Sequence, residues 1–208
     1  MLLACCLFLV QASTAQKSVS IVEWNFFSQK NGGTDNLTPT NLHADLSATG
    51  LIRGKGLTAI ADKTSGYWGA SNFSVSQEGP EEAIEKEKFI TFSITSNGKK
   101  TLSLKEIKPM KIRIFSVGPI NYLVQYSTDG TNFNEIAKTK VDRPEKQSDL
   151  LIPSINLSNI RDLQNIENGK TVQFRIVPWG ASRQAFSHFY LGSKYDVPSL
   201  SIVGGFNK

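Results

Sequence analysis

The sequence predicts an all-β protein, a single antiparallel β-sandwich of the jelly-roll kind with about ten strands and at most short helical turns. Apolar residues alternate with more polar ones through much of the chain, and turns containing Gly, Asn or Pro separate the alternating runs. Helical periodicity is scarce. No alternation of strands with helices is therefore expected, which favours antiparallel sheets.

The alternating runs are expected to form strands because residues two apart in a strand point to the same face of a sheet. In chain order, the expected strands cover residues 19–26, 57–61, 89–94, 101–107, 110–115, 121–126, 133–137, 171–176, 186–191 and 200–203. Two segments, 80–88 and 159–166, are expected to form short helical turns, and the first begins at Pro80. Neither is long enough to be stable as an isolated helix.

The stretch VQYSTDGTNFNEI, residues 124–136, contains a predicted hairpin. Its Asp129-Gly130 pair suits a tight turn, because such turns need a residue that tolerates positive φ. We expect Tyr126 before the turn and Phe133 after it to lie on one face and to pack together.

Residues 1–15 are predicted to be a secretory signal peptide that is cleaved after Ala15. They carry no charged residue and include an apolar run over 2–10, which is shorter than the roughly 20 residues of a membrane-spanning helix. The protein is therefore expected to be exported, extracellular or periplasmic, without a transmembrane segment. Residues 16–208 are expected to form one β-sandwich domain, since no Pro/Ser-rich linker divides them.

Cys5 and Cys6 are the only cysteines, and both lie in the predicted signal peptide. The run Leu2-Leu3-Ala4-Cys5 matches a bacterial lipoprotein pattern locally, so a lipid-anchored form is the alternative if the true start lies upstream. After cleavage no cysteine remains for a disulfide or a thiolate metal site. The net charge of +5 comes from scattered Lys and Arg, which predicts no nucleic-acid binding.

The run FSVGPINYLVQYSTDGTNF (115–133), followed by VQFRIVPWGAS (172–182), resembles secreted bacterial β-sandwich domains of the galactose-binding-like, jelly-roll type. In those domains a Gly-Pro turn leads into a strand that ends in Ser-x-Asp-Gly-x-x-Phe, and a later strand carries Phe-Arg. The resemblance implies the sandwich fold. It also implies binding, because many such domains bind sugars or cell surfaces.

Three aromatic residues beside predicted turns are candidate ligand-binding residues: Tyr67, Trp68 and Trp179. Sugar rings stack on exposed aromatic faces, and loop aromatics carry binding more often than aromatics within strands. Arg183, four residues after Trp179, can add a hydrogen-bond donor. Packing in the core or at a corner is the alternative for the aromatic residues, and a solvated surface position is the alternative for Arg183.

A structural calcium ion is the one metal expected, since jelly-roll modules can hold calcium with loop oxygens. The candidate ligands are Asp35, Asn36 and Asp62. No other cofactor and no catalytic residue is expected. The acidic group between residues 78 and 87 is interleaved with lysines, which is typical of a solvated face rather than of a glycosidase pair.

Together these observations favour an exported, non-catalytic binding module, with a glycan or polysaccharide at the cell surface as its partner. An envelope structural or adhesion protein that binds another protein is the alternative. A hydrolase has the least support.

Overall fold

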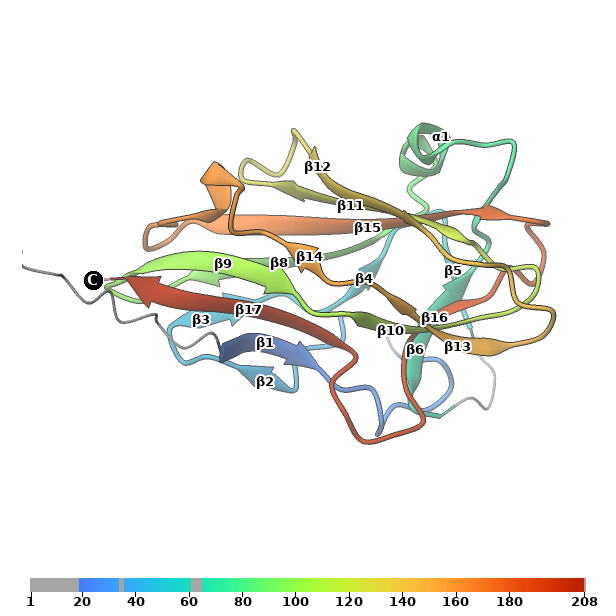
Figure 1. Ribbon diagram of the computed structural model, residues 1–208, viewed down its shortest axis with the longest axis horizontal. Helices are drawn as coiled ribbons and strands as arrows, with labels where there is room; N and C mark the ends of the chain where they lie inside the picture. The colour runs from blue at the N-terminus through green and yellow to red at the C-terminus, as the bar shows by residue number, and fades with distance from the viewer. Residues whose placement is uncertain (1–18, 34–35, 61–64, 208) are drawn as a thin grey trace, which may run out of the picture.

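The structure is a computed structural model that describes residues 19–33, 36–60 and 65–207. In these ranges it is nearly all β-structure, with 17 strands and one α-helix (Figure 1). The strands form three sheets, and every strand pairing except one is antiparallel. The prediction of an antiparallel β-sandwich is therefore confirmed. Within the described ranges, no helix has the length and apolar character to cross a membrane.

One layer of the sandwich is a single seven-stranded sheet. Its main path follows β12 (Asn134–Lys140), β11 (Asn121–Ser127), β15 (Thr171–Ala181), β8 (Ile90–Ser96) and β3 (Leu46–Ala48). Two short strands join it: β4 (Ile52–Arg53) pairs with β8, and β7 (Ser74–Val75) runs parallel to β15. In Figure 1 the strands β12, β11 and β15 lie along the top of the molecule.

The opposite layer consists of two five-stranded sheets that lie end to end (Figure 1). One sheet follows β14 (Ile155–Asn156), β9 (Thr101–Ile107), β17 (Leu200–Asn207), β1 (Val19–Trp24) and β2 (Asn41–Leu42). The other sheet follows β13 (Ser148–Ile152), β10 (Met110–Ile114), β16 (Phe189–Gly192), β6 (Tyr67–Ser71) and β5 (Thr58–Ala59). The chain passes from β9 to β10 through 108–109 alone, and from β13 to β14 through 153–154, which joins the two sheets into one layer.

The main core lies between the layers and is built by the predicted alternation. In β8, Ile90, Phe92 and Ile94 are buried, whereas the residues between them are partly exposed. The ring of Phe92 lies 5.0 Å from that of Trp24 in the opposite layer and 5.1 Å from that of Phe174 in the neighbouring strand. Such aromatic contacts add stability beyond the area they bury.

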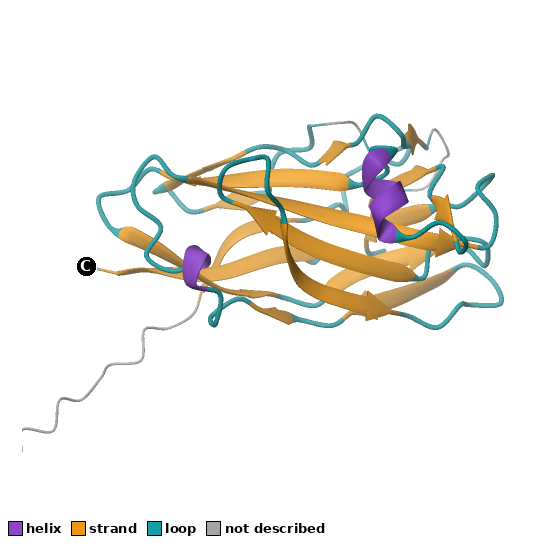
Figure 2. Cartoon of the chain, turned by 90° about the horizontal axis from the view of Figure 1, so that it is seen from above, coloured by secondary structure: helices purple, strands orange, loops and turns teal. Residues whose placement is uncertain are grey.

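Both predicted helical turns exist in shortened form: α1 (Pro80–Glu85) within 80–88, and a 3₁₀ turn, η1 (Arg161–Leu163), within 159–166. Pro80 stands in the first turn of α1, where its missing N–H has no helical partner in any case. Figure 2 shows α1 lying across the outer side of a sheet. Its Ala83 belongs to a small second core together with Trp179 of β15.

The turn after β11 differs from its prediction in one respect. Tyr126 pairs with Asn134 and is buried in the main core, whereas Phe133 precedes β12 and lies 3.9 Å from the guanidinium of Arg175. The side chain of Asp129 binds backbone amides beyond Gly130 and lengthens the turn, so β12 begins only at Asn134. The prediction that Tyr126 and Phe133 pack together is therefore wrong.

Four strands were not predicted because they contain only two residues, too few to form an alternating pattern. These are β2, β4, β7 and β14. The strand expected over 57–61 is present as the two-residue strand β5. The run predicted over 186–191 forms a strand only from Phe189, since Phe186 has a φ of 60°, which does not fit a strand.

Candidate functional site

Tyr67 and Trp68 do not present ring faces to solvent. Trp68 is fully buried in the main core, and the guanidinium carbon of Arg53 lies 4.2 Å from its ring centroid. Tyr67 is buried in a separate small cluster with Tyr190. The two rings point to opposite faces of β6: Trp68 enters the core between the layers, and Tyr67 is covered on the other face by Tyr190 and by Arg113, whose guanidinium carbon lies 3.9 Å from its ring centroid. Burial removes the stacking role expected for these two rings.

Trp179 is 7% exposed and packs against Ala83 of α1 and Leu123 of β11, so the helix covers most of its ring. The Lys138 ammonium lies 5.3 Å from the ring centroid. Arg183 is exposed beyond the end of β15, and its guanidinium lies 5.6 Å from the ring of Phe186. The three predicted aromatic residues thus belong to three separate clusters and form no common platform.

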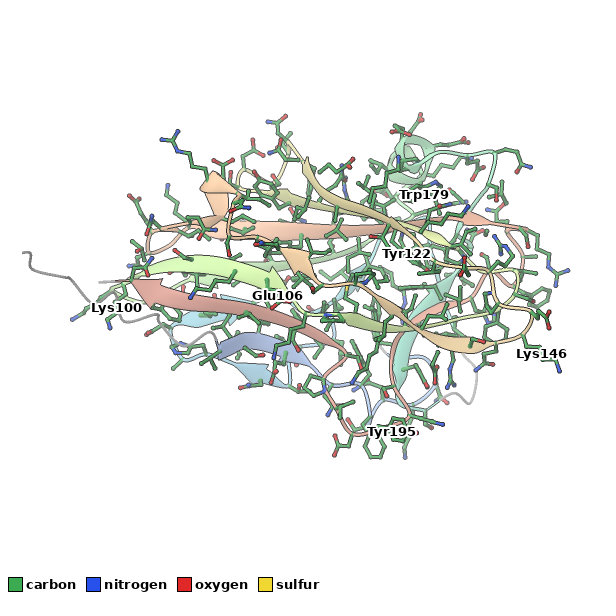
Figure 3. The ribbon with its side chains drawn as sticks, viewed as in Figure 1. Lys100, Glu106, Tyr122, Lys146, Trp179 and Tyr195 are labelled. Carbon is green, nitrogen blue, oxygen red and sulfur yellow. The ribbon has the colours of Figure 1, made fainter. Side chains whose placement is uncertain are left out.

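Tyr195, Phe186 and Phe27 are the exposed aromatic residues among the large apolar side chains of the described chain, at 63%, 66% and 50% exposure. Tyr195 lies in the loop between β16 and β17, on the opposite side of the molecule from Trp179 (Figure 3). Hydrogen bonds order this loop. The Tyr195 amide donates to Ser193 Oγ at 3.1 Å, and the Asn25 side chain donates to Asp196 at 2.6 Å.

Tyr195 borders a hollow of about 450 Å³ whose lining includes Asp149, Leu151 and Lys111. A second hollow of about 440 Å³ shares Lys111 and Leu151 with the first. Its lining also contains Lys108, Pro109, Glu23, Val197 and Pro198. We call the two hollows together the trough.

Strand pairing explains why the polar side chains of the trough converge. In β10, Met110, Ile112 and Ile114 enter the core, so Lys111 and Arg113 point outward. The antiparallel register sets Lys111 opposite Leu151 and Arg113 opposite Asp149, which places each pair on one face of the sheet.

The Asp149 carboxylate is held by three hydrogen bonds. Arg113 donates from Nε at 2.6 Å and from Nη2 at 2.9 Å, in a bidentate arrangement. The Tyr67 hydroxyl donates to the same carboxylate at 3.2 Å. Tyr67 therefore contributes to the site through its hydroxyl group, although its ring is buried.

Electrostatics keep these groups in the states that the hydrogen bonds require. Burial alone would raise the pKa of Asp149, but the hydrogen bonds and charge of Arg113 outweigh it and hold the pKa below its ordinary value. Burial raises the pKa of Tyr67 to about 12. At neutral pH the carboxylate is thus ionised and the tyrosine hydroxyl remains a donor.

The acidic group near α1 forms ion pairs rather than a catalytic pair. Lys86 donates to Glu78 at 2.8 Å and also contacts Glu82. The hydrogen bond from Lys86 is the main cause that lowers the pKa of Glu78 to about 2. A carboxyl group with so low a pKa is unsuited to act as a general acid near neutral pH.

The calcium prediction stays a prediction. Asp35 and Asp62 lie outside the described residues. Asn36 is described, and its Oδ1 accepts a hydrogen bond from the Gly50 amide at 3.2 Å. Within 19–33, 36–60 and 65–207, no group of three or more His, Cys, Asp or Glu side chains is placed to hold a metal ion.

No protein-family model matches the sequence, and no curated protein matches it. Among solved structures, the chain is similar to the K2 cleaved adhesin domain of Lys-gingipain, with 12% identity over 92% of this chain and 98% of that chain and a TM-score of 0.39. The chain is also similar to the K1 cleaved adhesin domain of Lys-gingipain from Porphyromonas gingivalis W83. That comparison has 10% identity over 93% of this chain and 100% of that chain, with a TM-score of 0.36.

A third similar structure is the carbohydrate-binding module CpGH89CBM32-5 from Clostridium perfringens, in complex with GalNAc-β-1,3-galactose. It has 11% identity over 76% of this chain and 94% of that chain, with a TM-score of 0.28. Likenesses this distant do not assign a function to the chain, and its function must be inferred from the site itself.

Proposed function

We propose that the protein is a non-catalytic glycan-binding module that acts outside the cytoplasm and holds its ligand in the trough. The observation that carries the proposal is an exposed tyrosine ring, Tyr195, beside an oriented carboxylate, Asp149, on the lining of one hollow. Glycans need this combination, because the C–H face of a sugar ring stacks on an aromatic face while its hydroxyl groups require hydrogen-bond partners.

Asp149 is suited to accept a hydrogen bond from a sugar hydroxyl. Two carboxylate oxygens offer about four acceptor positions, and the bonds from Arg113 and Tyr67 use about three. Its side chain is 43% exposed, so a ligand can reach the remaining position.

The site is also ordered before a ligand arrives. Asp149 and Arg113 lie on paired strands, and internal hydrogen bonds hold the Tyr195 loop. Few side chains of the trough must therefore become ordered when a ligand binds, and this low entropic cost favours affinity.

Glycan-array screening of the purified protein, followed by isothermal titration calorimetry on the best ligand, tests the proposal. We expect Tyr195→Ala to weaken binding by about tenfold or more, and Tyr195→Phe, which keeps the ring face, to bind nearly as well as wild type. Phe186→Ala is the matched control, because Phe186 is equally exposed but does not line the trough.

A protein that binds no glycan on the array would contradict the proposal. So would a Tyr195→Ala variant that binds with wild-type affinity. Because Tyr195 is exposed, its removal should leave the melting temperature unchanged, and a loss of binding then reports on contact with the ligand.

A further inference from the structure

We infer that the ligand of the trough is an anionic polysaccharide, a glycan that bears carboxylate or sulfate groups, and that Lys111 and Lys108 contact those groups. The inference rests on the proposed function and names the chemical class of its ligand.

Lys111 occupies the centre of the trough, since it lines both hollows. It is partly buried, and within the described ranges its ammonium forms no ion pair. A lysine ammonium without an ion-pair partner is available to pair with an anionic group of a ligand.

The carboxylates of the trough already have donors. Asp149 is bound by Arg113, and Glu23 accepts a hydrogen bond from the Asn41 side chain at 3.0 Å. Within the described ranges, neither carboxylate forms an ion pair with Lys111.

Other cations increase the positive charge of the trough. Lys108 lines the second hollow, where its ammonium donates to the uncharged Ser20 hydroxyl at 2.7 Å. Lys194 is close enough to Asp149 to contribute to lowering its pKa. Four cations, Lys111, Lys108, Lys194 and Arg113, thus lie in or beside the trough, against three carboxylates, Asp149, Glu23 and the nearby Asp196, which accepts from Asn25. The excess of one positive charge favours an anionic ligand.

The shape of the trough favours a chain of sugars over a single one. Each hollow has a volume within the range of about 300–1,000 Å³ typical of small-molecule sites. Tyr195 offers a stacking face in the first hollow, and Val197 and Pro198 offer apolar surface in the second. A polysaccharide that spans both must cross the shared residues Lys111 and Leu151, which brings its charged groups to the lysine.

The inference is tested by comparing three purified polysaccharides by isothermal titration calorimetry: polygalacturonate, chondroitin sulfate and a neutral galactan. We expect at least one of the two anionic chains to bind about tenfold more tightly than galactan at low salt. That preference should shrink as salt rises, because exposed charge pairs are screened. The two anionic chains distinguish carboxylate from sulfate as the recognised group.

The variant Lys111→Gln should weaken binding of the anionic chain by about fivefold and leave binding of the neutral chain unchanged, whereas Lys111→Arg should retain binding. Lys100→Gln is the matched control, because it removes the same charge from an exposed residue at the far left of Figure 3, away from Tyr195. Melting temperatures confirm that each variant is folded.

The outcomes separate this inference from the proposed function. If galactan binds as tightly as the anionic chains in a Tyr195-dependent manner, the anionic class is wrong and the glycan-binding module stands. If Lys100→Gln weakens binding as much as Lys111→Gln, attraction by the whole surface explains the preference, and the inference is overturned. If none of the three chains binds and the glycan array is also blank, both proposals fail.

Discussion

Two aspartates, Asp129 and Asp149, have pKa values below the ordinary 3.8, but they reach this state in different ways. Asp129 is bound by the side chains of Asn132 and Ser127 and by the amides of Thr131 and Asn132, all within three residues of it. The partners of Asp149 are Arg113, 36 residues away, and Tyr67, 82 residues away. Similar stabilisation of a charge thus builds a turn in one region and a candidate site in the other.

The difference lies in what remains available to a ligand. Asp129 also borders a hollow, of about 380 Å³, but its bonds satisfy the amides of its own turn, and none of the exposed aromatic residues of the described chain lines that hollow. Asp149 borders the trough together with an exposed ring, Tyr195, and with Lys111, which forms no ion pair with the residues that the structure describes. Replacing residues from each region therefore tests whether stability and binding can be separated.

The largest effect is expected for Trp68→Ala. Removal of a fully buried tryptophan from a core destabilises a protein by about 3–5 kcal/mol. Urea denaturation followed by fluorescence measures the loss. If the variant kept wild-type stability but lost glycan binding, Trp68 would have to contact the ligand, which would contradict its burial in the core.

The second-largest effect, on glycan affinity, is expected for Asp149→Asn, which removes the negative charge while keeping the size of the side chain. We expect glycan affinity to fall by about tenfold, because the charged acceptor is lost and Arg113 loses its bidentate carboxylate partner. The same calorimetric titration measures this. Asp142→Asn, on an exposed aspartate that lines neither hollow, should bind like wild type; equal losses of affinity in both variants would show that net charge alone matters.

A smaller effect, confined to stability, is expected for Gly130→Ala in the Asp129 turn. Gly130 has a φ of 77°, where an L-residue costs about 1 kcal/mol, and no atom is close enough for the added methyl group to clash. Thermal denaturation should detect the loss, while glycan affinity stays constant. A change in affinity would mean that the turn and the trough are coupled.

The smallest expected effect is a change with pH in the stability that Asp149 contributes. Because the folded-state pKa of Asp149 is lowered, its contribution to stability is fully present above the unfolded value and is lost as pH falls through the folded value. The stability difference between wild type and Asp149→Asn should therefore be constant near neutral pH and should narrow well below pH 3.8. Denaturation midpoints across this range measure it; a difference that widens on acidification would contradict the assigned direction of the shift.

Much of the fold follows from the sequence because alternation and turn chemistry act over a few residues. The buried face of β8, the start of α1 at Pro80 and the turn at Asp129 all depend on near neighbours in the chain. The two-residue strands β2, β4, β7 and β14 were not predicted because each is stabilised by its partner strand rather than by its own composition.

The exposed position expected for the rings of Tyr67 and Trp68 was wrong for a related reason. Glycines on either side of Tyr67 and Trp68 suggested a loop, but Gly69 is needed for close strand packing: a Cβ there would clash with the Phe189 carbonyl and the ring of Tyr190. The proposed stacking residue, Tyr195, lies instead within the turn-forming run GSKYDVP and not within an alternating run.

The sequence by itself determined an antiparallel β-sandwich, with the faces of its long strands and the conformation of its local turns, because these depend on side chains a few positions apart. Only the tertiary structure decided which polar groups meet. Asp149 reaches Arg113 through the β10–β13 register and Tyr67 through the order of strands in the sheet, and Tyr195 reaches the same hollow through the loop that follows β16. Those encounters depend on which strands pair, and strand pairing is settled by the free energy of the whole fold rather than by any local run of residues.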